Sequence, residues 1–322
     1  MRVIEKLQSA LILLAIAGGF VLGQNGWLAK HSVALIVPCL MLLLFGVFFN
    51  LPLNQLGKDL QNYRVLALSL GMNFLWTPVF AWGLGAVFLR NAPDLWVGLI
   101  MLMVTPCTDW YLVFTGIAKG NVGLATTLLP WNLLLQMLLL PVYLLIFTRL
   151  LIQIDVTLLL QSIGLVLLIP MFLAFTIKGL IPHLSEPWRQ IPEQLADAQP
   201  IFLSLAIAAM FTAQGQVLLQ RPDLLLRMLL PILIFFSVNF YLGQAIGRVG
   251  QLSYAELACF NCTTLARNSP IALAIATSAF PNRPLIALAL VIGPLIELPI
   301  MVLVSQRLLA IRRRYSSSKV IN

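Results

Sequence analysis

Charged residues are scarce in this chain of 322 residues, and their scarcity decides its broad class. Only 10% of the residues are Asp, Glu, Lys or Arg, whereas a soluble domain carries about 25%. So few charges cannot cover a water-facing surface, which excludes a cytosolic enzyme, a secreted domain and a nucleic-acid-binding protein. The formal net charge of +9 does not change this conclusion, because the basic residues lie in gaps between apolar runs instead of clustering on one face. We expect a polytopic membrane protein with no nucleic-acid partner.

Histidine and cysteine are too few to build a metal centre or a disulfide framework. The two histidines, His31 and His183, lie outside the long apolar runs, in segments that we expect to be loops. All four cysteines lie inside apolar runs, where a disulfide is not expected. The apolar runs also lack clustered carboxylates and a serine beside a base, so they offer nothing to an intramembrane enzyme. We therefore expect no catalytic residue, no metal ion and no cofactor.

Long apolar runs are what the chain has in abundance. It is 60% hydrophobic, with a mean hydropathy of +0.96, and a membrane helix needs about 20 apolar residues. Ten runs fit this length: 7–24, 32–53, 65–89, 95–117, 122–148, 156–178, 198–219, 225–247, 255–280 and 284–308. Thirteen basic residues lie in segments on the side of the N-terminus and six on the other side. The positive-inside rule then places both termini in the cytoplasm, and we expect a multi-pass protein of the plasma (inner) membrane, surrounded by the lipid bilayer.

The order of the spans predicts an internal repeat. Five helices followed by five more make the second set inverted relative to the first, which is typical of secondary transporters. Pro106 precedes Pro130 by 24 residues, and Pro270 precedes Pro294 by the same number. The sequence thus predicts an all-α membrane protein with ten transmembrane helices in two inverted five-helix repeats. Residues 1–181 would hold the first repeat and helix 6, residues 182–199 a polar linker, and residues 200–322 helices 7–10 with a basic tail.

Two spans contain a proline beside polar residues and are predicted to be broken. Residues 105–111 read Thr-Pro-Cys-Thr-Asp-Trp-Tyr, and residues 263–270 read Thr-Thr-Leu-Ala-Arg-Asn-Ser-Pro. Proline in a helix interior removes a backbone hydrogen bond, and in lipid such a break survives only inside protein or beside a water-filled cavity. Breaks at corresponding places in two repeats indicate a binding site where they cross. The alternative is two ordinary proline kinks.

Three ionisable residues lie well within the spans: Asp109, Arg267 and Glu297. Each costs about 2.5–3.5 kcal/mol at the bilayer centre, so each must pair with a partner or face a cavity. In one interpretation, Asp109 and Arg267 form a structural ion pair, and Glu297 is hydrogen-bonded to backbone groups freed by the breaks. In the other, Glu297 or Asp109 carries a coupling proton or cation.

The polar side chains near the breaks are the expected substrate-binding residues. They are Cys107, Thr108, Asp109, Asn132, Arg267, Asn268 and Ser269. A thiolate is a good ligand for soft elements. The alternative is that Cys107 is a small apolar packing residue, as most cysteines in membrane helices are. Asn132 and Gln136 share one helix face and either line the cavity or hydrogen-bond to neighbouring helices.

Three motifs are similar to those of a known family. They are Pro106-Cys107-Thr108 with Lys119-Gly120-Asn121, residues 268–274 (Asn-Ser-Pro-Ile-Ala-Leu-Ala) and residues 293–299 (Gly-Pro-Leu-Ile-Glu-Leu-Pro). In these the chain resembles the bile acid:sodium symporter superfamily, and within it the arsenite-efflux (arsenical-resistance) permeases. The resemblance implies discontinuous, crossed helices 4 and 9. It also implies a core of helices 3–5 and 8–10, approximately residues 65–149 and 225–308, and a panel of helices 1, 2, 6 and 7, approximately residues 7–53 and 156–219.

The resemblance also implies roles for single residues. In the arsenite permeases, the cysteine that matches Cys107 and the glutamate that matches Glu297 are the functional pair. Sodium-coupled members have a carboxylate where this chain has Thr263, and a Ser-Asn pair where it has Tyr111 and Leu112, which argues against a sodium site of that type. Arg267 is an addition relative to the arsenite permeases, as is Asp109, and indicates either a locked ion pair or an anionic substrate.

The leading hypothesis is a secondary active transporter that works by alternating access. It would export a small solute, arsenite or antimonite, by proton antiport, with Glu297 as the residue that carries the proton. The alternative is a sodium- or proton-coupled transporter of an organic anion, in which Arg267 binds the carboxylate of the substrate.

Overall fold

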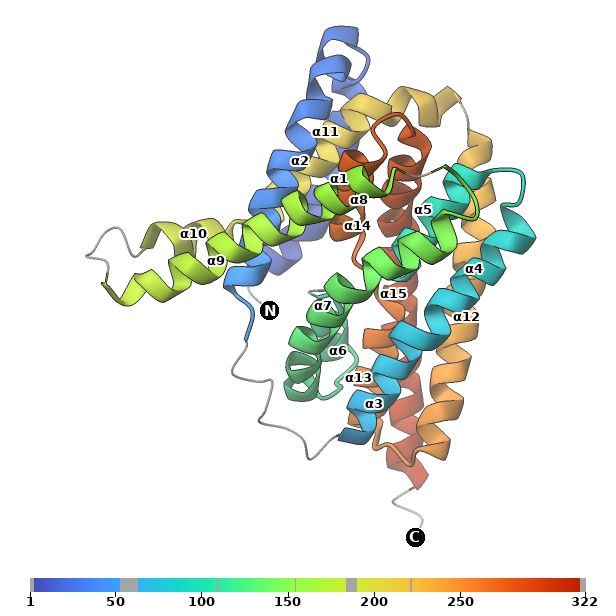
Figure 1. The fold of residues 1–322 in the computed structure, drawn as a ribbon. Helices are drawn as coiled ribbons and strands as arrows, with labels where there is room; N and C mark the ends of the chain where they lie inside the picture. The colour runs from blue at the N-terminus through green and yellow to red at the C-terminus, as the bar shows by residue number, and fades with distance from the viewer. Residues whose placement is uncertain are drawn as a thin grey trace. The chain divides into compact units, whose positions relative to one another are not determined.

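The computed structural model describes residues 3–52, 63–108, 110–153, 155–183, 190–220 and 222–318, which Figure 1 shows as a ribbon. Within these ranges the regular elements are all helices, which confirms the predicted all-α class. The bilayer offers no hydrogen-bond partners, so an apolar segment is stable there when the helix pairs its own backbone groups. Asp109 lies outside the described residues.

The helices follow one another with short connections. In chain order they are α1 (Val3–Leu22), α2 (Gly26–Phe49), α3 (Tyr63–Gly71), η3 (Met72–Trp76), α4 (Thr77–Phe88), α5 (Pro93–Met103), α6 (Trp110–Ile117), α7 (Val122–Tyr143), η4 (Leu144–Thr148), α8 (Val156–Ile163), η5 (Gly164–Leu168), α9 (Ile169–Leu180), η6 (Ile181–His183), α10 (Gln190–Asp197), α11 (Gln199–Gln220), α12 (Pro222–Val249), α13 (Tyr254–Leu265), α14 (Ser269–Ala279) and α15 (Pro284–Ser318). The segments η3, η4 and η5 are π-helical turns within longer helices.

In the described part of the chain, seven helical stretches are long and apolar enough to cross a membrane. They are Gly26–Phe49, Tyr63–Phe88, Val122–Thr148, Val156–His183, Gln199–Val217, Pro222–Val249 and Pro284–Arg313. Each overlaps one of the ten predicted spans. The other three predicted spans overlap the shorter apolar helices Leu11–Leu22, Pro93–Met103 and Ser269–Ala279. The seven long helices make this a multi-pass membrane protein, while ten spans in two inverted repeats remain a prediction.

The start of α2 differs from the prediction. The helix begins at Gly26, so His31 lies in a helix and the prediction of a loop there was wrong. The reason is a cap, because Asn25 Oδ1 accepts hydrogen bonds from the backbone nitrogens of Trp27 at 3.0 Å and Leu28 at 3.3 Å. An N-cap asparagine starts a helix independently of hydropathy. His183, also expected in a loop, is the last residue of η6.

The helices pack as two units. Unit 1 comprises Met1–Leu51, Ile154–Leu226 and Pro270–Val291. Unit 2 comprises Pro52–Gln153, Arg227–Ser269 and Ile292–Asn322. The long helices α12 and α15 contribute residues to both units.

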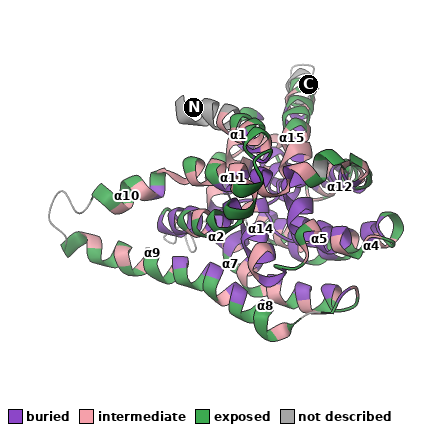
Figure 2. Cartoon of the chain, turned by 90° about the horizontal axis from the view of Figure 1, so that it is seen from above, coloured by how far each residue is buried: buried purple, intermediate pink, exposed green. Residues whose placement is uncertain are grey.

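In unit 1, α11 packs along α1 and α2, and α9 packs against α2 (Figure 1). Gly19 allows the close approach of α1, because a Cβ atom there would lie 2.7 Å from the carbonyl oxygen of Ala208 on α11. Most of α9 is exposed (Figure 2), and its exposed side chains include Phe172 and Leu173. An apolar outer surface of this kind suits contact with lipid.

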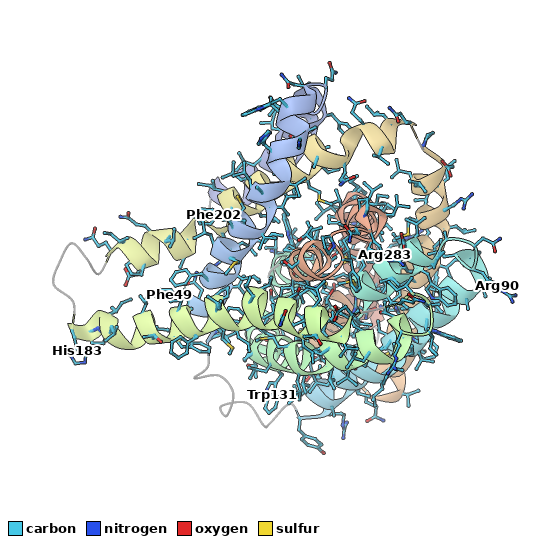
Figure 3. The ribbon with its side chains drawn as sticks, turned by 45° about the horizontal axis from the view of Figure 1, so that its top comes forward. Phe49, Arg90, Trp131, His183, Phe202 and Arg283 are labelled. Atoms are coloured by element: carbon cyan, nitrogen blue, oxygen red, sulfur yellow. The ribbon has the colours of Figure 1, made fainter. Side chains whose placement is uncertain are left out.

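The C-terminal end of α2 is capped by a cation. Lys178 Nζ, from α9, donates to the carbonyl oxygens of Phe49 at 2.8 Å and Leu51 at 3.2 Å. It also lies 6.0 Å from the centroid of the Phe49 ring, which Figure 3 labels. A positive charge is favourable at this end of a helix because the last carbonyl groups carry partial negative charge.

In unit 2, α13 packs against α3, α6 and α7, and α4 packs against α5. Two tyrosine hydroxyl groups in this unit donate hydrogen bonds to main-chain oxygens of neighbouring helical segments. Tyr111 of α6 donates to the carbonyl oxygen of Ala125 at 2.5 Å, and Tyr143 of α7 donates to that of Phe74 at 2.6 Å. The first of these bonds fixes α6, which begins just after the break at Pro106, to α7.

Candidate functional site

The two proline-containing segments interrupt their helices and pair with each other. α5 ends at Met103 and α6 begins at Trp110, while α13 ends at Leu265 and α14 begins at Ser269. Between these ends, Pro106 and Arg267 form an antiparallel β-bridge. Proline disfavours helical backbone in the residue before it, and the extended segments that result can satisfy each other's backbone groups inside the protein.

Two backbone hydrogen bonds flank the bridge. The amide nitrogen of Cys107 donates to the carbonyl oxygen of Ala266 at 3.0 Å, and that of Asn268 donates to the carbonyl oxygen of Thr105 at 2.7 Å. A side-chain bond continues this pairing, because Asn268 Nδ2 donates to Thr108 Oγ1 at 3.2 Å. Three of the predicted site residues, Cys107, Thr108 and Asn268, are therefore buried beside one another.

Glu297 is attached to the same bridge. It lies on α15 between Pro294 and Pro299 and is 5% exposed. Its Oε1 atom accepts a hydrogen bond of 2.8 Å from the backbone nitrogen of Arg267. The predicted contact of Glu297 with backbone freed by a break is present in the structure.

Arg267 points its guanidinium group into the ends of the helices. It is 3% exposed, and its nitrogens donate to main-chain oxygens of α5 and α13 and to Asn73 Oδ1. The guanidinium carbon also lies 5.1 Å from the centroid of the Phe235 ring, a cation–π contact. The predicted ion pair with Asp109 concerns a residue outside the described part of the chain.

Amide side chains extend the site into η3 and α7. Asn132 Nδ2 donates to Thr263 Oγ1 at 3.0 Å, and Asn73 Nδ2 donates to Asn132 Oδ1 and to the carbonyl oxygen of Thr263, both at 3.3 Å. All three residues are fully buried. Because Asn73 also accepts from Arg267, this network joins the predicted residue Asn132 to the bridge.

Sequence reasoning missed Asn73 and gave Thr263 no role in the site. The signal for Asn73 is an amide in the middle of an apolar span, where an unpaired polar group is costly. Ser269, another predicted site residue, is buried, and its Oγ has no hydrogen-bond partner in the described ranges. The same holds for both amide atoms of Gln136, one helical turn from Asn132.

Among the described residues, no group of three or more His, Cys, Asp or Glu side chains is placed to bind a metal ion. Cys259 and Cys262 are buried in α13 and, like Cys39 and Cys107, are not part of a disulfide. The described residues of the site supply one thiol, one carboxylate, several amides and hydroxyls, and a buried guanidinium group.

Comparison with known sequences agrees with this architecture. Residues 37–221 match the sequence profile described as the Sodium Bile acid symporter family. The matched stretch runs from within α2 to the end of α11 and includes Cys107. It covers more than half of the chain.

Three relatives align over most of their length. The chain is 25% identical to the arsenical-resistance protein Acr3 of Corynebacterium glutamicum, over 90% of this chain and 85% of that protein. It is 23% identical to the uncharacterized transporter slr0944 of Synechocystis, over 94% and 88% respectively. It is 24% identical to the uncharacterized protein YbaS of Bacillus subtilis, over 76% and 78%.

Proposed function

The chain belongs to the sodium bile acid symporter family, and from this premise we propose that it exports arsenite or antimonite by proton antiport. Members of this family are transporters, so transport of a small molecule is the general activity. The proposal adds the solute, the direction and the coupling ion. It is supported by the similarity to an arsenical-resistance protein and by the groups that the bridge brings together.

The observation that carries the proposal is the attachment of Cys107 and Glu297 to one β-bridge. Cys107 donates its amide to Ala266, and Glu297 accepts from the amide of the next residue, Arg267. Arsenic in arsenite is a soft centre, for which a thiolate is a natural ligand. A single thiol suits a transporter, because several thiolates would bind the solute too tightly for release.

The geometry of Glu297 is compatible with a proton carrier. Its Oε1 atom holds the amide of Arg267, and a carboxyl group keeps an acceptor oxygen whether or not its other oxygen bears a proton. Glu297 can therefore gain and lose a proton at Oε2 without giving up this bond. The protonation state would then change the charge beside Cys107 and not the backbone that positions it.

The transport cycle that we propose is alternating access between a core and a panel. The panel comprises helices of residues 7–53 and 156–219, and the core those of residues 65–149 and 225–308. Cys107, Arg267 and Glu297 lie within the residue ranges of the core, so solute and proton would bind to the core. We place both termini in the cytoplasm and the protein in the plasma membrane, and protease digestion of a C-terminal tag in sealed vesicles of known orientation tests this.

The second candidate function is coupled transport of an organic anion. The buried cation Arg267 favours it, since an anionic substrate needs a positive partner. Against it, four donor contacts of the guanidinium go to oxygens of the protein. The arsenite proposal requires no positive charge at the solute and is therefore the better supported of the two.

The thiol is tested by replacing Cys107 with serine, which keeps size and polarity and removes the soft ligand. We expect Cys107→Ser to abolish arsenite uptake into inverted vesicles while the protein remains folded. The double variant Cys259→Ser with Cys262→Ser is the matched control, because those buried thiols lie in α13 outside the bridge. Full arsenite transport by Cys107→Ser would refute capture by the thiol.

The carboxylate is tested by Glu297→Gln, which keeps an acceptor for the amide of Arg267. We expect this variant to fold and to lose proton movement driven by arsenite, recorded with a pH-sensitive dye in proteoliposomes. Glu193→Gln on α10, where the carboxylate is exposed, is the matched control and should couple normally. If Glu297→Gln still links arsenite flux to a pH gradient, another residue carries the proton.

A further inference from the structure

The side chain of Arg267 is surrounded by oxygens of the protein. Nε donates to the carbonyl oxygen of Leu265 at 3.1 Å, and Nη1 donates to that of Met103 at 2.8 Å. Nη2 donates to the carbonyl oxygen of Thr264 and to Asn73 Oδ1, the latter at 3.2 Å. All four acceptors are neutral. They replace the water that a guanidinium group would otherwise hold, and they use both of its edges.

The bond from Arg267 to Met103 completes the hydrogen bonding at the C-terminal end of α5. The last four carbonyl groups of a helix have no partner within the helix, and in α5 each has found another. Val104 donates its amide to Ile100 at 2.9 Å, and Thr105 Oγ1 donates to Met101 at 2.9 Å and to Leu102 at 3.0 Å. The fourth carbonyl, that of Met103, receives Arg267.

The end of α13 is completed in the same way. The amide of Ala266 donates to Cys262 at 3.1 Å, and Asn73 Nδ2 donates to Thr263 at 3.3 Å. The last two carbonyl groups, those of Thr264 and Leu265, both receive Arg267. One side chain thus caps two helices that break at different places in the sequence, and it puts a positive charge at two negative helix ends.

The main chain of Arg267 holds the groups on which transport depends. Its amide donates to Glu297, and the residues on either side of it pair with Cys107 and Thr105. A displacement of the guanidinium group would therefore move the backbone to which the carboxylate and the thiol are fastened.

We propose that Arg267 is a positioning residue, a tethered cation that caps α5 and α13 together and thereby sets the places of Glu297 and Cys107. It does not bind the transported solute. A carboxylate or similar anion binds arginine through two parallel N–H groups on one edge, and both edges are engaged with Leu265, Met103, Thr264 and Asn73. This inference rests on the proposed function, in which Glu297 carries the proton and Cys107 binds the solute, because these are the two groups that Arg267 positions.

The first test measures the protection of Cys107 and needs no substrate. In a background with Cys39, Cys259 and Cys262 replaced by alanine, Cys107 is the remaining thiol, and its labelling by N-ethylmaleimide reports local opening. We expect Arg267→Gln to raise the labelling rate about tenfold, because the capped ends open more often. Arg267→Lys should raise it as well, since a compact ammonium group cannot span both helix ends although it keeps the charge. Lys178→Met, which removes a helix-capping cation from unit 1, is the control and should leave the rate unchanged.

The second test measures arsenite counterflow in proteoliposomes, normalised to the amount of folded protein. A positioning role predicts that the maximal rate of Arg267→Lys and Arg267→Gln falls about tenfold while KM stays within about twofold. A purely structural role would reduce the folded fraction and leave the rate per folded molecule intact. A raised KM with an unchanged maximal rate, or unchanged labelling of Cys107 in both variants, would overturn the proposal.

Asn73→Leu keeps the proposal testable if neither arginine variant folds. It removes one acceptor and leaves the three carbonyl groups in place, so we expect labelling of Cys107 to rise about two- to threefold and the maximal rate to fall with KM unchanged. Unchanged labelling in this variant contradicts the proposal. If the unaltered protein does not move arsenite, the proposed function fails, and the labelling experiment still decides the role of Arg267.

Discussion

Both units of the molecule place a cation against the C-terminal end of a helix, and they do so in opposite surroundings. In unit 1, Lys178 is exposed and caps α2 alone. In unit 2, Arg267 is buried and caps α5 and α13 at once. The chemistry of the contact is the same, but water can replace Lys178 and cannot easily reach the acceptors of Arg267. Burial therefore decides how much such a contact contributes to the free energy of unfolding.

The two units also differ in which buried polar side chains they contain. Among the described residues, the buried polar side chains of unit 1 are three hydroxyls, those of Ser32, Ser162 and Thr212. The buried amides and both buried charged side chains belong to unit 2. Within the described ranges, unit 1 therefore has few directed hydrogen bonds between buried side chains, whereas unit 2 adds such bonds to its apolar packing. The buried amide and charged side chains are thus concentrated in unit 2.

The largest expected effect on stability comes from removing the buried cation. In Arg267→Met, three carbonyl groups and the Oδ1 atom of Asn73 lose their donor while they remain buried. We expect the free energy of unfolding to fall by about 3–5 kcal/mol, the range found when a buried charged contact is broken. Chemical unfolding in detergent micelles measures it. A loss below about 1 kcal/mol would mean that the buried and exposed caps are equivalent, and the comparison between the units would fail.

The next effect concerns the amide network of unit 2. Asn132→Leu and Thr263→Val each leave one member of the 3.0 Å hydrogen bond unpaired, and each should destabilise the protein by about 1–3 kcal/mol. The double variant removes both partners, so its loss should be clearly smaller than the sum of the two single losses. A double-mutant cycle by thermal unfolding measures this coupling energy. Strictly additive losses would show that the two side chains act independently.

Much of this molecule could be predicted from its sequence because hydropathy dominates in a membrane. The apolar runs predicted the long helices, and proline beside polar residues predicted the breaks near Pro106 and Pro270. The prediction was wrong at the start of α2. There a capping residue, Asn25, determines where the helix begins, and the helix extends beyond the apolar run.

The partners of the buried charges could not be predicted in this way. Arg267 and Asn73 are 194 residues apart in the chain, and nothing local to either residue encodes their contact. The direction of the guanidinium group depends on the backbone path through the break, which the sequence motif does not specify. For the same reason the sequence left open whether Arg267 is structural or binds a substrate.

A loss of stability in the same range is expected from filling the space at glycines, and it should be larger in unit 1. A Cβ atom on Gly19 would lie 2.7 Å from the carbonyl oxygen of Ala208, whereas one on Gly293 would lie 2.7 Å from the end of the Leu102 side chain. Backbone cannot move without separating α1 from α11, but a leucine side chain can rotate. We expect Gly19→Ala to destabilise by about 1–3 kcal/mol and Gly293→Ala by less, measured by thermal unfolding. The reverse order would contradict the view that unit 1 depends on close packing.

The smallest effect is expected from the exposed cap, and its salt dependence sharpens the contrast between the units. Lys178→Met keeps an unbranched side chain over the Phe49 ring and removes the charge from the carbonyl groups of Phe49 and Leu51. Interactions of an exposed charge with a helix end contribute about 0.3–1 kcal/mol and are screened by salt. The difference between Lys178→Met and the unaltered protein should therefore shrink as NaCl is raised from 0.05 M to about 1 M, where the screening length is about 3 Å. The deficit of Arg267→Met should persist over the same range, because salt does not enter its buried surroundings. Parallel unfolding curves for both variants at the two salt concentrations measure this, and equal sensitivity to salt would mean that the acceptors of Arg267 are open to water.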